Sequence, residues 1–561
     1  MFLPLHLDIR VMLASAHQAD YIDGNWLYAV LNSWELKGFL DRAAVYGLYK
    51  IANVFALYAS GYYFEVLIKF FFFIIATGMV FASAYLACKE KKAFNINIAL
   101  LTCSAIYASL IHSHVQAEMI CVLILILAFA IYINSKINAK YVNLKLFISG
   151  FLAATTIFYK SIFALMALVF FAVIFLWNKR NNKTFSIKEI LYFVMGGLSA
   201  IFIGFVVIML FNPSEIEWVK NAGMYENTIV FGARPKFKDI WQLFSNRFAY
   251  SCLAIPVVFL GILAGFKNFV DKLRKKDAVA AVAHFVIWAV PSIVIILANK
   301  YFTYHYTLFM FSALFELYMA FGDKKYFEVL KNKLFKWEYI CFALIVVLFY
   351  SLIKIFDWSS QKGEVFIFVA GLYIAFAFVI NCFKNDKLKS YVNIKIPLTI
   401  ICIVYLSYIS IFSDNFYIWK KLIKKMYKVN KNYIERMKID KKEQILYLDG
   451  GMSTYILGNK SYLEEHFPLS LQRITEGSPF ENSKVHIEAL ERVLKYNGKY
   501  IVLNRVWFFG GENERNLKIQ EKLKKEYHSI GEIEYVSVGI AIFKRQSKND
   551  FVRVEIYERN K

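Results

Sequence analysis

Several motifs that mark common chemistries are missing from this sequence of 561 residues. It contains no GxxxxGK[ST], no GxGxxG after a predicted strand, no GxSxG and no HExxH. Phosphate-loop nucleotide chemistry therefore has no visible support. The seven cysteines lie in or beside apolar segments, without CxxC or Cys/His ligand spacing. Neither a disulfide framework nor a zinc site is indicated.

Acidic residues are also few, because 42 Asp and Glu stand against 66 Lys and Arg and give a formal net charge of +24. A nucleic-acid groove needs its cations on one continuous face, whereas these fall between hydrophobic runs. They are better explained as the basic cytoplasmic loops of a membrane protein. No cleavable signal peptide is predicted, since residues 1–7 have no basic start and no long apolar core.

Hydrophobic residues, in contrast, make up 58% of the chain, more than in an ordinary soluble protein. A membrane-crossing helix needs roughly 20 apolar residues, and about twelve candidates are present. The sequence thus predicts a polytopic α-helical membrane protein. The predicted helices centre on residues 63–88, 96–111, 118–133, 146–158, 162–177, 190–211, 249–266, 278–298, 303–321, 339–356, 365–383 and 394–412. The short pair around Lys160 fits either one long helix or two helices that do not fully cross.

Basic residues cluster in alternate loops between these helices, at 89–92, 136–140, 179–183, 272–276, 324–336 and 384–389. Because Lys and Arg near helix ends stay on the cytoplasmic side, these loops are predicted to share that side. The first loop (5–49), the loop at 212–250 and everything after residue 413 are then predicted to be extracytoplasmic. This topology places a multi-pass protein in the plasma (inner) membrane, with residues 1–412 as its transmembrane domain.

The composition changes after the last apolar run. Residues 413–440 include a basic amphipathic stretch that predicts a linker helix at the membrane surface. Residues 441–561 predict a small extracytoplasmic α/β domain, large enough for its own core. Its strands are expected in EQILYLDGG, KYIVLN and EIEYVSVGIAIFKR, and its helices at 483–496 and 514–527.

Candidate functional residues gather at the predicted outer ends of the helices. Acidic side chains at a membrane boundary are expensive unless they face water, a partner or a ligand. Asp8 in HLD is expected near the interface, while Asp20, Asp23 and Glu35 are better explained as solvated loop residues. Glu118 lies at the start of an apolar helix. Its negative charge either interacts favourably with the helix dipole or points into the same outer region as Asp8.

A second group of candidates follows the helix at 278–298. The stretch KYFTYHY carries Lys300, His305 and Tyr306 to the outer end of the next helix. A Lys at this position either reaches lipid headgroups or meets a bound phosphate, so both interpretations predict an anion nearby. The loop at 212–250 mixes aromatic residues with Arg234 and Arg247, a composition typical of an interfacial belt and also of sugar stacking beside a phosphate.

The order of these parts resembles the GT-C glycosyltransferases, in particular the protein mannosyltransferase and aminoarabinose-transferase branch. The resemblance covers nearly the whole chain and rests on HLD, FLDRAAVYGLY, GFLAATTIFYKS, KYFTYHY and the C-terminal YLDGGMSTYILGNKS. Members of this family have a membrane helix before the first external acid, whereas seven residues precede Asp8 here. The resemblance therefore implies either a further helix ahead of this sequence or a different residue in the place of Asp8.

The resemblance implies a transfer of a sugar, with inversion, from a polyprenyl-phosphate donor to an extracytoplasmic glycan, lipid or protein. Asp8 would be the general base, and Glu118 and Asp41 would shape the site or polarise the acceptor. The residues expected to bind the substrate or its phosphate are Arg42, Lys300, His305, Tyr306 and Lys160. No nucleotide or redox cofactor is required, and a divalent metal shared by Asp8 and Glu118 stays open.

Other functions remain open at this stage. A flippase or secondary transporter of a lipid-linked saccharide would be expected to show inverted repeats and charges at mid-membrane, and neither is seen. A polysaccharide polymerase or ligase of the cell envelope is compatible with Arg234 and Arg247 in a large external loop. A non-enzymatic envelope scaffold is the remaining alternative.

Overall fold

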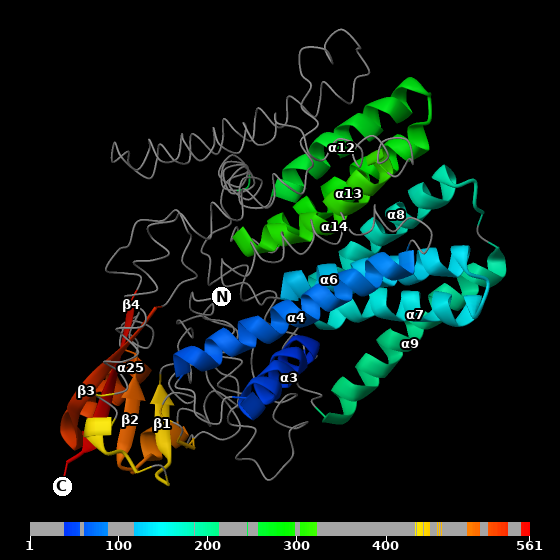
Figure 1. Ribbon diagram of the computed structural model, residues 1–561. Coiled ribbons are helices and arrows are strands. Elements are labelled where there is room, and N and C mark those ends of the chain that lie inside the picture. Colours follow the sequence, from blue (N-terminus) through cyan, green and yellow to red (C-terminus); the bar gives the residue numbers. More distant parts are fainter. Residues whose placement is uncertain are drawn as a thin grey trace, which may run out of the picture.

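The computed structural model describes a helical bundle and a four-stranded sheet (Figure 1). The described residues are 39–55, 61–87, 117–184, 186–211, 244, 256–297, 303–321, 432, 435–440, 442–448, 457, 459–460, 462, 491–504, 514–536 and 551–560. Five described helices are long and apolar enough to cross a membrane, which confirms a helical membrane protein. The predicted linker at 413–440 and most of the loop at 212–250 lie outside the described residues.

The bundle follows the chain order closely. Its α-helices are α3 (Phe39–Phe55), α4 (Gly61–Ala87), α6 (Ala117–Ile137), α7 (Val142–Thr155), α8 (Met166–Arg180), α9 (Ile187–Phe211), α12 (Pro256–Arg274), α13 (Ala278–Leu297) and α14 (Phe309–Phe321). Short 3₁₀ helices η1 (Thr156–Phe158), η2 (Ser161–Leu165) and η4 (Thr303–Leu308) lie between or before them. Eight of the predicted membrane helices therefore correspond to described helices.

The remaining four predicted helices, at 96–111, 339–356, 365–383 and 394–412, lie outside the described residues. The helix predicted at 249–266 lies further along the chain in the structure. The α12 helix starts at Pro256 and continues through a charged turn to Arg274. Proline suits the first turn of a helix, where its missing N–H has no helical partner. Around Lys160 the chain forms two helices, and α7 with η1 is one of the shorter apolar segments.

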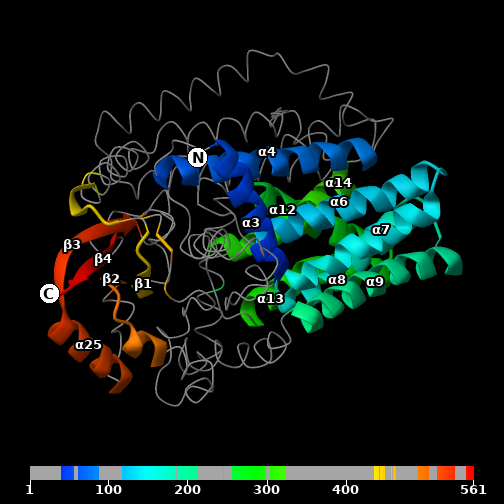
Figure 2. The same ribbon diagram turned by 90° about the horizontal axis from the view of Figure 1, so that it is seen from below.

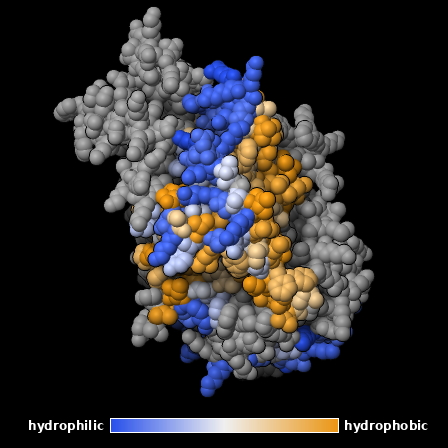
Figure 3. Space-filling view, turned by 90° about the vertical axis from the view of Figure 1, so that its right-hand side faces the viewer, coloured by the Kyte–Doolittle hydropathy of each residue, from blue (hydrophilic) through white to orange (hydrophobic). Residues whose placement is uncertain are grey.

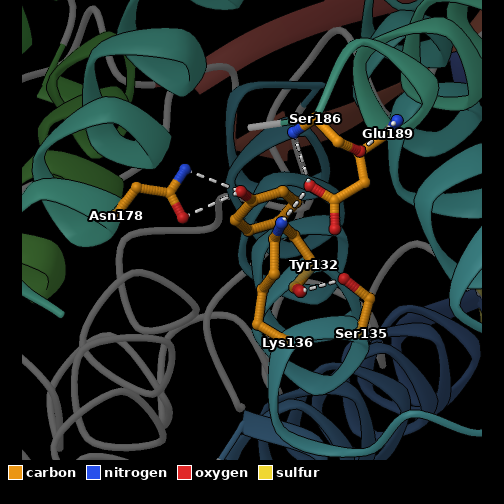
Figure 4. Close-up of polar contacts among 6 residues, drawn as sticks. All are labelled: Tyr132, Ser135, Lys136, Asn178, Ser186 and Glu189. Atoms are coloured by element: carbon orange, nitrogen blue, oxygen red, sulfur yellow. Dashed lines mark hydrogen bonds and ion pairs between the residues drawn. The ribbon is translucent and has the colours of Figure 1, made fainter. Parts of the chain in front are cut away.

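One end of the bundle is held together by polar side chains from the helix termini (Figure 4). Lys136 Nζ of α6 lies 2.6 Å from Glu189 Oε2 of α9. The Tyr132 hydroxyl and the Asn178 side-chain amide hydrogen-bond at 2.7 and 3.1 Å, which links α6 to α8. Ser186 and Glu189 cap the start of α9 reciprocally, each bonding the other's backbone N–H. This end therefore has little freedom to change its helix register.

Further contacts extend this arrangement to the other helices. Asn134 donates to the Leu86 carbonyl at the end of α4, and Arg180 of α8 donates to the Tyr318 carbonyl of α14. Lys179 pairs with Asp277 between α12 and α13 at 2.6 Å, and this pairing lowers the pKa of the Asp277 carboxyl. Three of the predicted basic loops, at 136–140, 179–183 and 272–276, thus lie at one end, which we call the inner end.

The side chains on the surface of the bundle are suited to contact with lipid around its sides and with water at the inner end. Figure 3 shows hydrophilic side chains grouped beside a hydrophobic band. The α9 helix exposes Leu198 (60%), Phe202 (68%) and Leu210 (71%), although it is strongly apolar. Such exposure is costly in water and ordinary in a bilayer.

Two pairs of helices approach each other through glycine. A Cβ atom added to Gly196 of α9 would lie 1.9 Å from the Phe147 carbonyl oxygen of α7, and one added to Gly150 would lie 2.0 Å from the Phe193 oxygen. Gly261 of α12 makes a similar approach to Ala313 of α14. Small residues at these positions allow close backbone packing where no hydrophobic force between helices exists in lipid.

A buried polar cluster joins α12, α13 and α14 toward the inner end. Glu316 is fully buried, and its two carboxylate oxygens contact His284 Nδ1 at 2.8 Å and Asn268 Nδ2 at 2.7 Å. The Gly265 backbone leaves space beside the Glu316 side chain and the Trp288 indole. We call these three bonded residues the inner cluster; neither their pairing nor their role was predicted from the sequence.

The C-terminal residues form a mixed sheet in the order β1–β2–β4–β3. Its strands are β1 (Ile445–Leu448), β2 (Tyr500–Leu503), β3 (Tyr527–Val536) and β4 (Phe551–Arg559). The β1 and β2 strands are parallel and buried on both faces, as their uninterrupted apolar sequences suggest. The helix α25 (Glu514–Glu526) contributes Ile519 and Leu523 to the core on one face. The predicted strands at β1 and β2 and the helix at α25 are confirmed.

In both ribbon views the sheet lies beyond the end of the bundle at which α4 begins (Figures 1 and 2). Since α4 ends at the inner end, this is the opposite end, which we call the outer end. The short α3 helix lies beside the first half of α4 in both views.

The glycine contact predicts a position-specific effect on stability. We expect Gly196→Ala to destabilise the protein by about 1–3 kcal/mol, because the new methyl group overlaps the α7 backbone. The matched control is Gly78→Ala in α4, where the added Cβ meets nothing within 4 Å and alanine favours the helix. Thermal unfolding in detergent measures both; equal melting temperatures for the two variants would contradict the packing described.

Candidate functional site

Glu118 is the second residue of α6 and lies at the outer end of the bundle. Its side chain is fully buried, so its charge needs a partner of opposite sign or a hydrogen-bond donor. Two groups supply it: Lys160 Nζ forms an ion pair with Glu118 Oε1, and His305 Nδ1 lies 2.7 Å from the same oxygen. The three residues come from three separate segments of the chain, and we call them the outer cluster.

Lys160 reaches Glu118 because the helix breaks immediately before it. Thr155 and Thr156 bond back to the carbonyls of Leu152 and Ala153, an interaction that competes with regular helix geometry. The chain tightens into η1, and Lys160 then adopts an extended backbone (φ −152°, ψ 129°). Its side chain is 18% exposed. The break therefore places a lysine at the point where α7 and α8 meet.

His305 is held in η4, directly before α14. The neighbouring Tyr306 is fully buried and donates a hydrogen bond of 3.0 Å to the Phe244 carbonyl. Its ring also packs against those of Phe244 and Phe309. The two residues of the HY pair therefore have different roles. His305 contacts Glu118, and Tyr306 holds η4 against Phe244 from the loop at 212–250.

Asp41 and Arg42 lie in the first turn of α3 and are both buried, with 0% and 5% exposure. The ring of Phe39 packs 5.3 Å from that of Phe158 in η1, so this turn lies against the same break that positions Lys160. Asp41 also interacts electrostatically with Tyr159, the residue before Lys160. The acidic–basic pair is therefore brought next to the outer cluster.

Of the residues predicted from the sequence, Glu118, Lys160 and His305 are in direct contact, and Asp41, Arg42 and Tyr306 adjoin them. Asp8 and Lys300 lie outside the described residues, so their roles stay predictions. Sequence reasoning missed Tyr159 and the buried Lys69 of α4. A lysine inside an apolar run, IKFFFF, was the available signal for Lys69.

A metal site is not visible in the part of the chain that the structure describes. There, no group of three or more His, Cys, Asp or Glu side chains gathers closely enough to hold an ion. Glu118 Oε1, half of the carboxylate pair proposed as ligands, is already engaged by Lys160 and His305. The metal proposed between Asp8 and Glu118 remains a prediction.

Comparison with known proteins identifies the fold. No protein-family model matches the chain, and no curated protein matches it in sequence. Among solved structures, the apo crystal structure of ArnT from Cupriavidus metallidurans is similar over 99% of this chain and 94% of its own, with 11% identity and a TM-score of 0.50. ArnT is an aminoarabinose transferase of the GT-C family. The GT-C resemblance is thus confirmed as a shared fold.

The outer cluster predicts energetic coupling between Glu118 and Lys160. We expect Glu118→Gln and Lys160→Gln each to lower stability, because each leaves the other charge without its partner in a low-dielectric site. The double variant should lose less than the sum, with a coupling of about 1–3 kcal/mol. Unfolding of the four proteins in the same detergent measures this cycle; additive losses would show that the two side chains do not interact.

Proposed function

We propose that this protein is a GT-C-type membrane glycosyltransferase that uses a polyprenyl-phosphate sugar as donor. The observation that carries the proposal is the outer cluster with its neighbours: charged side chains from α3, α6 and the α7–α8 break meet His305 of η4 at one end of an apolar bundle. Charged groups inside a membrane fold are expensive and usually functional. The ArnT-like fold supports the same class of activity.

The reaction is a displacement at the anomeric carbon of the sugar. An acceptor hydroxyl attacks this carbon from the face opposite the phosphate, the bond to the phosphate oxygen breaks, and polyprenyl phosphate leaves with the electron pair. The configuration is inverted. The phosphoester of the donor supplies the energy, so the reaction needs no nucleotide. Because the donor is held in the plane of the membrane, much of the rate comes from orientation.

The residues divide into three roles in this proposal. Asp8 accepts the proton of the attacking hydroxyl as general base. Glu118 is less suited to that role, because its Oε1 already accepts from Lys160 and His305. It instead holds these two groups in place, and together with Arg42 they stabilise the charge that collects on the leaving phosphate. Asp41 orients the acceptor, and Tyr306 keeps His305 in position.

The acceptor is a glycan, lipid or protein on the extracytoplasmic side, beside the C-terminal sheet. This assignment follows from the topology proposed here, in which the basic loops of the inner end face the cytoplasm. The sheet lies at the outer end of the bundle, where the donor sugar would be presented. We therefore propose that the C-terminal domain covers the site or positions the acceptor.

The first test is transfer by purified protein reconstituted with a radiolabelled polyprenyl-phosphate sugar and a membrane extract as the acceptor source. We expect labelled product from the wild-type protein. For Asp8→Asn we expect transfer to fall by about a hundredfold or more, the contribution typical of a general base. Undiminished transfer by Asp8→Asn would remove Asp8 from catalysis. Absence of transfer by the wild-type protein would contradict the proposed activity.

A matched pair of variants separates chemistry from stability. Both Glu118 and Glu316 are fully buried and bonded to a histidine, but they lie in the outer and inner clusters respectively. We expect Glu118→Gln and Glu316→Gln both to reduce thermal stability, whereas only Glu118→Gln should reduce transfer per folded molecule, by at least about tenfold. Equal losses of transfer would mean that the outer cluster is a packing feature.

A further inference from the structure

The α9 helix has a notch at Gly204, toward its outer end. The neighbouring residues Phe202, Ile203 and Phe205 are exposed on the lipid-facing side of the helix, whereas Gly204 is buried. A Cβ atom added to Gly204 would lie 2.1 Å from Cζ of Phe158 and would also overlap its two Cε atoms. The ring of Phe158 therefore packs directly on the α9 backbone, in space that a larger residue would fill.

The same ring also contacts α3. Its centroid lies 5.3 Å from that of Phe39, a distance at which two aromatic rings attract each other. Phe39 is buried, and Asp41 and Arg42 follow it in the first turn of α3. Phe158 thus contacts both the lipid-facing helix α9 and the turn that carries the buried acidic–basic pair.

Phe158 lies two residues before Lys160, in the break between α7 and α8. There the Tyr159 N–H bonds to the Thr156 carbonyl at 3.2 Å, and the backbone then becomes extended at Lys160. A short 3₁₀ turn has poorer hydrogen-bond geometry than an α-helix, so side-chain packing contributes much of what holds it in place. The contacts of Phe158 with α9 and α3 supply this packing directly beside Lys160.

The notch differs from the other glycine contacts of α9. At Gly196 the added Cβ would overlap the backbone of α7, whereas at Gly204 it would overlap a side chain of the break. Gly204 stands eight residues after Gly196 (204 − 196), which is about 12 Å further toward the outer end. Gly196 therefore sets the distance between two helices, and Gly204 sets the position of the Phe158 ring.

We propose that Phe158, packed on Gly204, is a positioning residue for Lys160 in the transfer reaction. The inference rests on the proposed function and connects the lipid-facing helix α9 to the outer cluster. When the ring is displaced, the break moves with it, and the Lys160 ammonium group no longer meets Glu118 in the observed geometry. Because a displacement of about 1 Å can lower a rate by about a hundredfold, activity depends on the size of residue 204.

The first test enlarges residue 204. Carbon atoms pack at about 3.5–4 Å from each other, so the methyl group of Gly204→Ala displaces the Phe158 ring by more than about 1 Å. We expect transfer per folded molecule to fall by about a hundredfold. The loss should be in kcat more than in KM, since Lys160 stabilises charge that develops in the transition state. Wild-type activity of Gly204→Ala would overturn the inference.

A compensating variant tests whether the ring causes this loss. The three atoms that the new methyl group overlaps, Cζ, Cε1 and Cε2, are absent from leucine. The double variant Gly204→Ala/Phe158→Leu should therefore be about tenfold or more as active as Gly204→Ala, although it also loses the contact with Phe39. A double variant that is no more active than Gly204→Ala would overturn the role of Phe158.

The matched control is Gly196→Ala in the same helix. This variant is expected to destabilise the protein but to leave transfer per folded molecule unchanged, because the Phe158 ring keeps its place. Equal losses of transfer in Gly196→Ala and Gly204→Ala would mean that loosened packing of α9 is responsible, which would overturn the inference.

A second measurement needs no transfer activity and thus separates this inference from the proposed function. A small amine-reactive reagent is added to the full-length protein, and the labelling rate of Lys160, whose side chain is 18% exposed, is followed by mass spectrometry. An ammonium group paired with a carboxylate reacts slowly, because the neutral amine is the nucleophile. We expect the rate to rise about tenfold in Gly204→Ala, the effect of losing one charge-assisted hydrogen bond, and to fall again in the double variant.

Unchanged labelling of Lys160 in Gly204→Ala would overturn the inference whatever the activity. Faster labelling that the double variant reverses, in a protein without transfer activity, would support the placement of Lys160 by Phe158 and contradict the proposed function alone. Should Gly204→Ala not fold, Phe158→Leu is measured in its place, since it keeps the notch and removes the outer ring atoms. Labelling of Lys160 at the wild-type rate in Phe158→Leu would again overturn the inference.

Discussion

The structure depends on the need to compensate each charge that is placed inside an apolar bundle. Glu118 is buried where water does not reach it, and Lys160 and His305 both approach one of its carboxylate oxygens. These contacts define where α6, the α7–α8 break and η4 meet. The break itself, with its two threonines and extended Lys160, places the ammonium group opposite a buried carboxylate, and removing either charge would leave the other without this partner. The site and the helix packing around it therefore share one set of interactions.

The two ends of the bundle are built differently. At the inner end, Tyr132 bonds Asn178 and Lys136 pairs with Glu189 near the helix termini. Glycine contacts between α7 and α9 also bring these two backbones close together. Lys136 and Glu189 are complementary in charge. At the outer end, the buried Glu118 brings together Lys160 and His305 from two other segments, and a folded sheet lies beyond them. A rigid inner end and a charged outer end suit the proposed enzyme, which would hold a lipid phosphate at one side of the membrane.

Much of the fold could be predicted from the sequence because apolar runs have the length of the bilayer and basic loops alternate between them. The predicted ends of α12 were shifted, since its charged last turns extend past the apolar run. Glu118 and His305 were found as polar residues at helix starts. Their contact with Lys160 could not be predicted, because it depends on long-range packing of α6 against η4 and the α7–α8 break. Lys69 and the inner cluster were missed for the same reason: a single polar residue in an apolar helix does not reveal which helix it faces.

The central claim is that the outer end of the bundle binds a lipid phosphate. The most direct measurement is an electron cryomicroscopy map of the full-length protein in nanodiscs with undecaprenyl phosphate. We expect phosphate density at the depth of Glu118, close to Lys160 and His305, with the polyprenyl chain leading into the surrounding lipid. Phosphate density at the inner end beside Lys136 and Glu189, with the outer end empty, would contradict the account.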